Sequence, residues 1–566
     1  MARLVGELGT TPLIARVLAT RGMDEPETAG RFLRPSLEHL HDPYLLTGMD
    51  GAVRRLRRAI EAKETVLIYG DYDVDGTTSV VILKKAIELA GGTATFHVPH
   101  RLREGYGMRS EVIERAAAEG VKLIISVDTG IRALDVVSEA RHLGLDVIVT
   151  DHHLPEAELP AALAVLNPNR PDCRYPEKNL CGAGVTFKLV QALLATLDWP
   201  PDKLRRMLRS FLKLVAIATV ADVVPLTGEN RVIVKYGLDS MTRINNPGLQ
   251  ALMEVSGLCK GGIPTAREIA FQIAPRINAA GRMAQADDVI RLFLTSDLAE
   301  ARKLAGELHI LNQERQQTEA DIVKAILNEC VTTPVTDDDR ALVFCRTGWH
   351  RGVVGIVASR LVERFWRPVF VLSEEDGEAQ GSGRSIPAFH LLDALESMSD
   401  LFTRFGGHRQ AAGLGMHSGR VAEFRQRFNA YAATRLTPAD FRPQLAIDAV
   451  MQLDELNDES TEQLLSLAPF GFGNSSPVLA VMKAEMCGEP SILKEKHLRL
   501  RVRQGNRYLS ATAWNFSDRS GECRPNVEMD IAFCLEEDNY SRDRGWPAWR
   551  AVLKDIRSAQ YVQASA

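Results

Sequence analysis

The sequence predicts an α/β protein of several domains: a parallel-sheet domain, a long connecting helix, a second α/β domain and a C-terminal all-β barrel. Three observations support this prediction. From Thr65 onward, short apolar runs alternate with helical segments, as in parallel sheets. Residues 298–330 contain no proline and one glycine, Gly306, which is typical of one long helix or two abutting helices. After FRPQ (441–444), short alternating strands and Gly/Asn turns indicate a barrel.

The first domain contains four apolar runs that are predicted to be strands. Because continuous apolar strands between helices are covered on both faces, we expect one α/β domain from residue 40 to about residue 230. The loop GDYDVDG follows the first strand, and a helix is predicted from about Thr77 to Leu89. The predicted strands are residues 66–69, 94–98, 122–127 and 145–150.

The chain is predicted to have five parts. A helical lead-in precedes the first domain, whose second part, from about residue 231, is mostly helical. The middle of the long helix, Asn312 to Glu319, is wholly polar, which is typical of a helix that bridges domains through solvent. The predicted parts are residues 1–40, 41–297, 298–330, 331–440 and 441–566.

Composition excludes several classes of protein. The chain has 566 residues, of which 45% are hydrophobic and 25% charged, as in ordinary soluble proteins. No run of apolar residues is long enough to span a membrane, and the N-terminus lacks the apolar core of a signal peptide. The eight cysteines are scattered without a C-x-x-C pair, which suits the reducing cytoplasm and argues against a zinc ribbon. Because the net charge is −5, any nucleic-acid site must be a local basic patch.

Three aspartates, Asp71, Asp73 and Asp75, alternate in the loop GDYDVDG. In an extended loop, alternate side chains point the same way, so at least two carboxylates would converge just past the strand end. Like charges held together are costly unless cations neutralise them. We expect Gly76 to allow a sharp turn and Thr77 to cap the following helix. For this loop alone, an exposed, solvated aspartate turn is an equal alternative.

Further carboxylates and imidazoles follow the other strands. Asp128 comes directly after the third strand, and Asp151, His152 and His153 come directly after the fourth. A further candidate, Asp222, follows an apolar run in ATVADVVPL. Ligands of open α/β sheets bind outside the carboxyl ends of the strands, so these residues are expected at one edge.

This mixture of ligands favours Mn²⁺ or Mg²⁺ over thiolate-bound zinc. Several carboxylates around two metal ions is the arrangement that serves phosphoester displacement. The chain has no Walker A motif, no G-x-G-x-x-G after a strand and no G-x-S-x-G. Nucleoside-triphosphate, dinucleotide and serine-hydrolase functions therefore lack their usual signatures.

In order along the chain, GDYDVDG, VDTG, TDHH and ADVVPL resemble the four motifs of the DHH phosphoesterase superfamily. Four later motifs are similar to those of its RecJ branch: FQIAPRINAAGRM (271–283), GWHRGVVGIVASRL (348–361), GSGRSI (381–386) and GGHRQAAG (406–413). The resemblance implies a DHH catalytic domain, a DHHA1 domain and a C-terminal oligonucleotide-binding (OB) fold. It also implies a single-strand-specific 5′→3′ DNA exonuclease of DNA repair and recombination, which releases 5′-mononucleotides with two divalent cations, Mn²⁺ or Mg²⁺.

The resemblance assigns roles to the residues at the sheet edge. It implies two metal sites that share Asp128, and a histidine, His153, that faces the scissile phosphate. Asp73 and Asp128 would hold one ion, with Asp71 nearby. The other ion would be held by Asp75, Asp128, His152 and Asp222.

Residues of the later motifs are expected to bind DNA. The resemblance implies that Arg101, Ser382 and Arg384 bind a terminal 5′-phosphate, and arginine forks suit that ligand. Each of the remaining candidates has a structural alternative, either capping a helix or forming a buried contact. These candidates are Arg276, Asn278 and Arg282 along the strand's path, His408, and His350 with Arg351 before a helix N-terminus.

Apolar residues and arginines alternate in the barrel segment HLRLRVRQGNRYLSATAW. Leu498, Leu500 and Val502 are predicted on one face and Arg499, Arg501 and Arg503 on the other, where an arginine row could follow a nucleic-acid backbone. Tyr508 and Trp514 are candidate stacking platforms. The alternative is a solvated outer face with ordinary core aromatics, Trp514 especially.

Two other functions stay open from the sequence. One is hydrolysis of short RNA or cyclic dinucleotides by a DHH relative, although such relatives typically lack so long a chain and the barrel. The other is a non-catalytic nucleic-acid-binding scaffold, against which the full set of carboxylates argues. We expect a cytoplasmic monomer without a membrane partner. The resemblance implies single-strand-binding protein and a helicase as partners.

Overall fold

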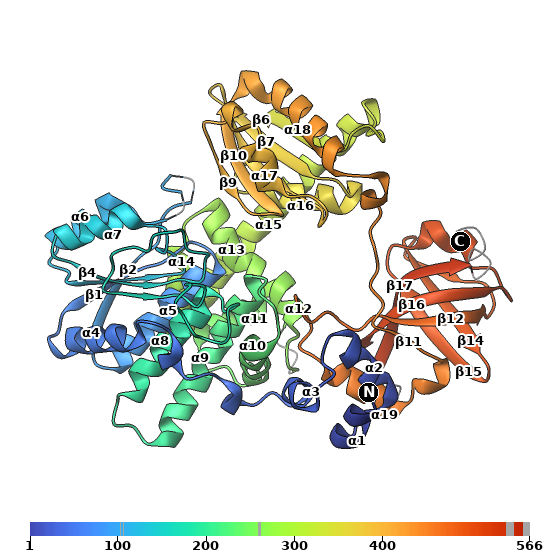
Figure 1. The fold of residues 1–566 in the computed structure, drawn as a ribbon, viewed down its shortest axis with the longest axis horizontal. Helices are drawn as coiled ribbons and strands as arrows, with labels where there is room; N and C mark the ends of the chain where they lie inside the picture. The colour runs from blue at the N-terminus through green and yellow to red at the C-terminus, as the bar shows by residue number, and fades with distance from the viewer. Residues whose placement is uncertain (102, 106, 259–261, 539–547, 559–566) are drawn as a thin grey trace.

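The computed structural model of the chain describes residues 1–101, 103–105, 107–258, 262–538 and 548–558 (Figure 1). A five-stranded sheet with the order β2-β1-β3-β4-β5 forms the centre of the first domain, and all its strands are parallel. The predicted parallel sheet is therefore confirmed. The strands are β1 (Thr65–Tyr69), β2 (Thr93–His97), β3 (Leu123–Val127), β4 (Asp146–Thr150) and β5 (Ala164–Leu166).

Both faces of this sheet are covered, as the unbroken apolar strands predict. Side chains of β1 alternate between the two cores: Val66 and Ile68 pack on one side, and Leu67 and Tyr69 on the other. The first face is covered by α4 (Met49–Glu61), α5 (Val74–Leu89) and α8 (Gly182–Ala195), and the second by α6 (Ser110–Ala118) and α7 (Leu134–His142).

The second part of the first domain is helical, as predicted, and extends the first core. A π-helical turn, Ile269–Ile273, leads into α13. The helices are α9 (Pro201–Ala221), α10 (Gly228–Ser240), α11 (Pro247–Val255), α12 (Ala266–Glu268), α13 (Ala274–Met283) and α14 (Asp287–Leu294).

A single helix, α15 (Leu298–Thr332), connects the first domain to the second α/β domain (Figure 1). Leu304 and Leu308 of its first half lie in the first core, and Ile322 and Ile326 of its second half lie in the next one. The polar middle is less exposed than predicted, because Asn312 and Arg315 are buried.

The second α/β domain contains a mixed sheet with the order β6-β7-β8-β10-β9, in which only β6 and β7 are parallel. Its strands are β6 (Leu342–Thr347), β7 (Val369–Glu375), β8 (Glu378–Arg384), β9 (Arg404–Gly407) and β10 (Ala411–His417). Its helices are α16 (Val354–Phe365), α17 (Leu391–Glu396) and α18 (Val421–Arg435).

The C-terminal domain is a barrel, as predicted. Its sheet has the order β11-β12-β16-β17-β15-β14-β13, and an additional pairing of β12 with β14 closes the ring. Residues 539–547 and 559–566 of the predicted domain lie outside the described residues. The elements are β11 (Ala449–Val450), α19 (Asp458–Ser466), β12 (Leu479–Met486), β13 (Ser491–Leu493), β14 (His497–Gln504), β15 (Arg507–Ala513), β16 (Glu528–Glu537) and β17 (Trp549–Ser558).

The N-terminal helices α1 (Ala2–Leu8), α2 (Pro12–Thr20) and α3 (Pro26–Leu33) lie beside this barrel (Figure 1). Leu4 and Leu13 share a core with barrel residues such as Leu479. The N-terminal helices and the barrel therefore share one core. The predicted domain boundaries stay predictions. No helix in the described ranges is long and apolar enough to cross a membrane.

Candidate active site

The acidic loop passes directly into α5. The side chain of Asp73 caps this helix by accepting a hydrogen bond from the Gly76 N–H at 3.0 Å. The expectation that Thr77 caps the helix is wrong, because the helix begins at Val74, and the Thr77 hydroxyl instead donates to the Asp73 carbonyl. Gly76 is helical, not a turn residue, and a Cβ there would lie 2.5 Å from the Asp71 carbonyl oxygen. Aspartate is a strong N-cap, which explains the early start.

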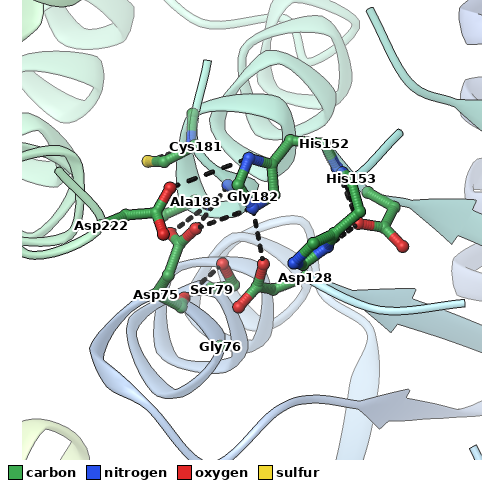
Figure 2. Close-up of polar contacts among 12 residues, drawn as sticks. Asp75, Gly76, Ser79, Asp128, His152, His153, Cys181, Gly182, Ala183 and Asp222 are labelled. Atoms are coloured by element: carbon green, nitrogen blue, oxygen red, sulfur yellow. Dashed lines mark hydrogen bonds and ion pairs between the residues drawn. The ribbon is translucent and has the colours of Figure 1, made fainter. Parts of the chain in front are cut away.

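Asp75 is held by the N-terminus of another helix. Its two carboxylate oxygens accept hydrogen bonds from the backbone N–H groups of Gly182 and Ala183, at 2.6 and 2.7 Å (Figure 2). These residues begin α8, where unpaired N–H groups favour an anion. A Cβ on Gly182 would lie 2.7 Å from the Asp128 side chain, so only glycine fits between the two aspartates.

His152 stands at the centre of the carboxylates (Figure 2). Its Nε2 lies 3.2 Å from Oδ1 of Asp128 and 3.8 Å from Oδ2 of Asp75. Its Nδ1 lies 3.8 Å from Oδ2 of Asp222, which follows α9. The ends of β3 and β4, the start of α5 and the end of α9 thus converge on one point.

His153 is turned toward Asp151, whose Oδ1 lies 2.7 Å from its Nδ1. Asp151 is buried and also accepts hydrogen bonds from the backbone N–H groups of Ile131, His152 and His153. Burial alone would lower the pKa of His153, but the hydrogen bond and charge of Asp151 raise it overall. The sequence places Asp151 at the strand end, but no motif or spacing in it indicates that Asp151 pairs with His153.

The clustered carboxylates are poorly stabilised as anions without a cation. Burial, and then the charges of neighbouring aspartates, raise the pKa values of Asp71, Asp128 and Asp222 well above the usual range. The Oδ1 atom of Asp71 is buried and has no hydrogen-bond partner among the described residues.

The ligand atoms fit divalent cations. Three groups of side chains each bring one ligand atom per residue within 4.8 Å of the others. These groups are Asp71, Asp73 and Asp128; Asp75, His152 and Asp222; and Asp128, His152 and His153. Oxygen ligands with imidazole suit Mn²⁺, and Mg²⁺ with water. Burial, and then the charge of Asp75, raise the pKa of the neighbouring Cys181 thiol well above its usual value.

Three of the predicted DNA-binding arginines face this site together. The guanidinium of Arg101 lies 4.9 Å from the centre of the Tyr72 ring in the acidic loop. Burial, and then the charges of Arg101, Arg315 and Arg384, lower the pKa of Arg282 to about 10. Burial, and then Arg101, likewise lower the pKa of Arg384. Such mutual repulsion of half-buried cations is relieved by a bound anion.

Arg384 and Ser382 lie beside the start of α16. A Cβ on Gly355 would be 3.3 Å from Nη2 of Arg384 and 3.4 Å from Cβ of Ser382. A helix N-terminus, a hydroxyl and a guanidinium therefore meet at one place, as phosphate binding requires.

A cavity of about 460 Å³ lies between the acidic loop and the second α/β domain. Ser382 and Arg351 line it together with Tyr72, Arg404 and Phe405. The motifs predicted no role for the last three residues: Tyr72 lies between the motif aspartates, and Arg404 and Phe405 directly precede the motif GGHRQAAG.

Other candidates are occupied within the protein. Arg276 donates hydrogen bonds to Nδ1 of His309 at 3.2 Å and to the Val255 carbonyl at 3.4 Å, which favours its structural alternative. Nδ1 of His350 accepts from the Gly352 N–H, and Arg351 pairs with Glu375 at 3.0 Å.

Two further candidates border the site. Asn278 is half-buried on α13, the helix that also carries Arg282. His408 lies in the exposed turn between β9 and β10. Partial burial, and then the charges of Arg132 and His153, lower the pKa of His408, so this turn of the second α/β domain is close to the first domain.

The arginine row lies on the barrel surface as predicted. Arg499 and Arg501 are exposed on β14, alternating with buried Leu498, Leu500 and Val502. Arg501 lies over the Tyr508 ring, while Arg503 pairs with Glu485 at 2.7 Å. Trp514 is 43% exposed, so its predicted core alternative is wrong. In Figure 1, β14 is on the side of the barrel away from the first domain.

Known proteins resemble the whole chain. The family models "DHH family, N-terminal domain", "DHHA1 domain" and "RecJ OB domain" match residues 65–219, 338–434 and 447–546. Two curated relatives carry the name single-stranded-DNA-specific exonuclease RecJ. The one from Bacillus subtilis is 40% identical over 93% of this chain and 66% of its own length, so this chain spans about two thirds of it. The one from Escherichia coli is 34% identical over 94% of both chains.

A solved structure agrees with these relatives. The crystal structure of RecJ in complex with Mn²⁺ from Thermus thermophilus matches with a TM-score of 0.82 and 32% identity, over 98% of this chain and 77% of that one. Sequence identity over most of the chain, the matched domains and the fold agree, and the chain belongs to the RecJ family.

Proposed function

We propose that this chain is a metal-dependent exonuclease that degrades single-stranded DNA from the 5′ end and releases 5′-mononucleotides. One observation carries the proposal: the carboxylates and imidazoles of four motifs meet at one sheet edge, and the arginine trio Arg101, Arg282 and Arg384 lies beside them. Relatives of the same family are named for this activity.

Two divalent cations, Mn²⁺ or Mg²⁺, complete the site in this proposal. The first would be held by Asp71, Asp73 and Asp128, and the second by Asp75, Asp128, His152 and Asp222. When bound, such ions lower the pKa of the attacking water and offset charge on the phosphoryl group.

The protein's own groups position the substrate. Because Nδ1 of His153 faces Asp151, we assign Nε2, on the opposite side of the ring, to an oxygen of the scissile phosphate. Arg101, Ser382 and Arg384 would hold the terminal 5′-phosphate at the start of α16. The distance between these two phosphate positions would set the length of the product at one nucleotide.

Selectivity for single strands would be steric. The turn carrying His408 lies near enough to His153 for their charges to interact. The second α/β domain would therefore narrow the entrance to the site, so that a double helix would not fit. Exposed Arg499 and Arg501 would bind the following part of the strand by contacts with its phosphates. This barrel surface favours a long strand over a short RNA or a cyclic dinucleotide.

The test is degradation of one sequence presented as single-stranded DNA, as the duplex and as RNA, each labelled at either end, with Mn²⁺ or Mg²⁺. Immediate release of labelled mononucleotide from the 5′ end of single-stranded DNA alone is expected. Preferential cleavage of RNA, or of oligomers of a few nucleotides, would assign the chain to a different branch.

Partners and location belong to the same proposal. We propose a monomer in the cytoplasm that works beside single-strand-binding protein and a helicase. Light scattering during size-exclusion chromatography tests the oligomeric state. Titration of each purified partner against the labelled protein tests the complexes.

A further inference from the structure

A loop of the barrel touches the segment that carries Asp222. The barrel loop, residues 467–474, is the first part of the connection between α19 and β12. Its Phe472 carbonyl accepts a hydrogen bond of 2.7 Å from the backbone N–H of Leu226. Leu226 lies in the turn between α9 and α10, four residues after Asp222. The barrel is thus joined by a main-chain hydrogen bond to the turn that follows Asp222, a candidate metal ligand of the first domain.

The contact is tightly packed. A Cβ on Gly471 would lie 2.6 Å from Cδ1 of Leu226. A Cβ on Gly473, which has a φ of +70°, would lie 2.7 Å from Cβ and 3.0 Å from Cα of Pro225. Since real Cβ atoms do not approach so closely, any side chain at Gly473 must displace the turn or the loop.

The barrel loop is itself held firmly. The buried Asn474 donates hydrogen bonds to the carbonyls of Leu467 and Pro469, and accepts one from Arg21, the residue directly after α2. From the other side, the buried Arg231 of α10 donates to the carbonyls of Leu467 and Ala468, at 2.9 and 3.0 Å. The loop is therefore fixed to both the barrel and the first domain.

The turn that it supports has an unfavourable conformation. Val223, directly after Asp222, has a φ of +59° and is 60% exposed. A β-branched residue in this left-handed region is strained and persists only where its surroundings impose it. Two contacts hold the residues that follow Val223. The Asn230 side chain donates a hydrogen bond to the Pro225 carbonyl at 3.1 Å, and the barrel loop accepts one from the Leu226 N–H.

We propose that the barrel loop 467–474 is a positioning element for Asp222, so that the barrel contributes to metal binding and turnover as well as to DNA affinity. The inference rests on the proposed function in taking Asp222 as a metal ligand. Groups that orient metal ligands typically change metal affinity or activity by about 10- to 100-fold when altered.

The test compares Gly473→Ala with Gly488→Ala in the full chain. Both glycines belong to the barrel domain and have similar backbone angles, with φ of +70° and +74°, but a Cβ at Gly488 meets nothing within 4 Å. Comparing the two variants therefore separates the effect of a clash with the turn from the effect of backbone strain, which both variants share. Mn²⁺ binding is followed by the electron paramagnetic resonance of free Mn²⁺. Turnover is measured with 5′-labelled single-stranded DNA, and DNA affinity by fluorescence anisotropy in EDTA.

For Gly473→Ala we expect Mn²⁺ affinity and kcat each to fall about tenfold, with DNA affinity within twofold of the wild type. Gly488→Ala should match the wild type in all three. Equal behaviour of the two variants, or a loss confined to DNA affinity, would overturn the inference. Should Gly473→Ala fail to fold by circular dichroism, Gly471→Ala, which meets only the Leu226 side chain, is judged by the same criteria. If the wild type does not degrade DNA, the Mn²⁺ comparison still decides this point separately from the proposed function.

Discussion

Asp151 and His153 form a pair at the carboxyl end of β4, in which Oδ1 of the buried aspartate lies 2.7 Å from Nδ1 of the imidazole. The Ile131 N–H donates to the other oxygen of Asp151 at 2.9 Å, so the carboxylate is fixed from two directions. A fixed carboxylate in turn fixes the plane of the ring and the position of its far nitrogen.

Replacing Asp151 with asparagine is therefore expected to lower kcat by about 10- to 100-fold while DNA affinity is retained. The reason is that Asp151 acts through His153. In that case Asp151→Asn combined with His153→Ala should be no slower than His153→Ala alone. Initial rates of the three variants form a double-mutant cycle, and fully additive losses would contradict the coupling.

Asp128→Asn should reduce hydrolysis by about 10³-fold or more, because this carboxylate borders both predicted metal sites. Asparagine is close in size and tolerates the left-handed backbone that Asp128 adopts, with φ of +59°. Loss of one clustered charge also relieves repulsion, so metal-free thermal stability should stay equal or rise. Rates and melting curves check this, and turnover near the wild-type value would disprove the two-metal assignment.

Divalent cations should stabilise the fold. At about 100 times its dissociation constant, a ligand that binds only the native state adds about 2.7 kcal/mol. Mn²⁺ should therefore raise the midpoint of the first thermal transition, and EDTA should reverse the shift. Asp71→Asn should reduce this response, whereas Asp135→Asn, an exposed carboxylate on α7, serves as the control. Equal Mn²⁺ responses of the two variants would speak against a ligand role for Asp71.

Arg384→Ala should chiefly reduce the preference for a 5′-phosphorylated end, by about tenfold or more in kcat/KM, because charge-assisted hydrogen bonds to phosphate are lost. Arg364→Ala is a matched control, since Arg364 is exposed in the last turn of α16, at the opposite end from Gly355. Competition between phosphorylated and unphosphorylated substrates measures the preference. An equal loss on both substrates would refute end recognition by Arg384.

Arg499→Ala and Arg501→Ala together should weaken binding of single-stranded DNA at low salt. Each lost phosphate contact should reduce the slope of log affinity against log salt by about 0.7. Point changes are the sharper test, because truncation near residue 443 would uncover Leu4 and Leu13 in the shared core. An unchanged salt slope would indicate that the arginine row is only a solvated face.

Much of this structure could be predicted from residue patterns. The first four strands of the first domain, β1 to β4, lie within one residue of their predicted bounds, because apolar runs between polar turns define them well. The short β5 escaped prediction, because three apolar residues do not form a recognisable period. At the site, the order of the motifs indicated the candidate ligands. The loop was predicted to be extended through Asp75, whereas Asp73 caps α5 and Asp75 lies in the first turn of that helix.

Other relationships that the sequence did not predict join distant parts of the chain. Arg276 pairs with His309 across two helices, and the packing of α1 to α3 in the barrel core joins residues more than 400 positions apart. Neither leaves a periodic signal, because such contacts depend on tertiary geometry and not on local propensity.

Because α15 is one continuous helix, the number of residues in it determines how the second α/β domain is rotated relative to the first domain. Its 35 residues span about 52 Å, and each residue added to it rotates the second α/β domain by about 100° relative to the first domain. One inserted residue between Leu308 and Ile322 would therefore turn the arginine of the phosphate site, Arg384, away from the acidic loop without altering either core. Seven inserted residues would nearly restore the orientation but would separate the halves by about 10 Å. The length of α15 thus sets both the distance and the rotation between the two domains. Insertions or deletions in this helix are therefore tolerated far less than in a flexible connection.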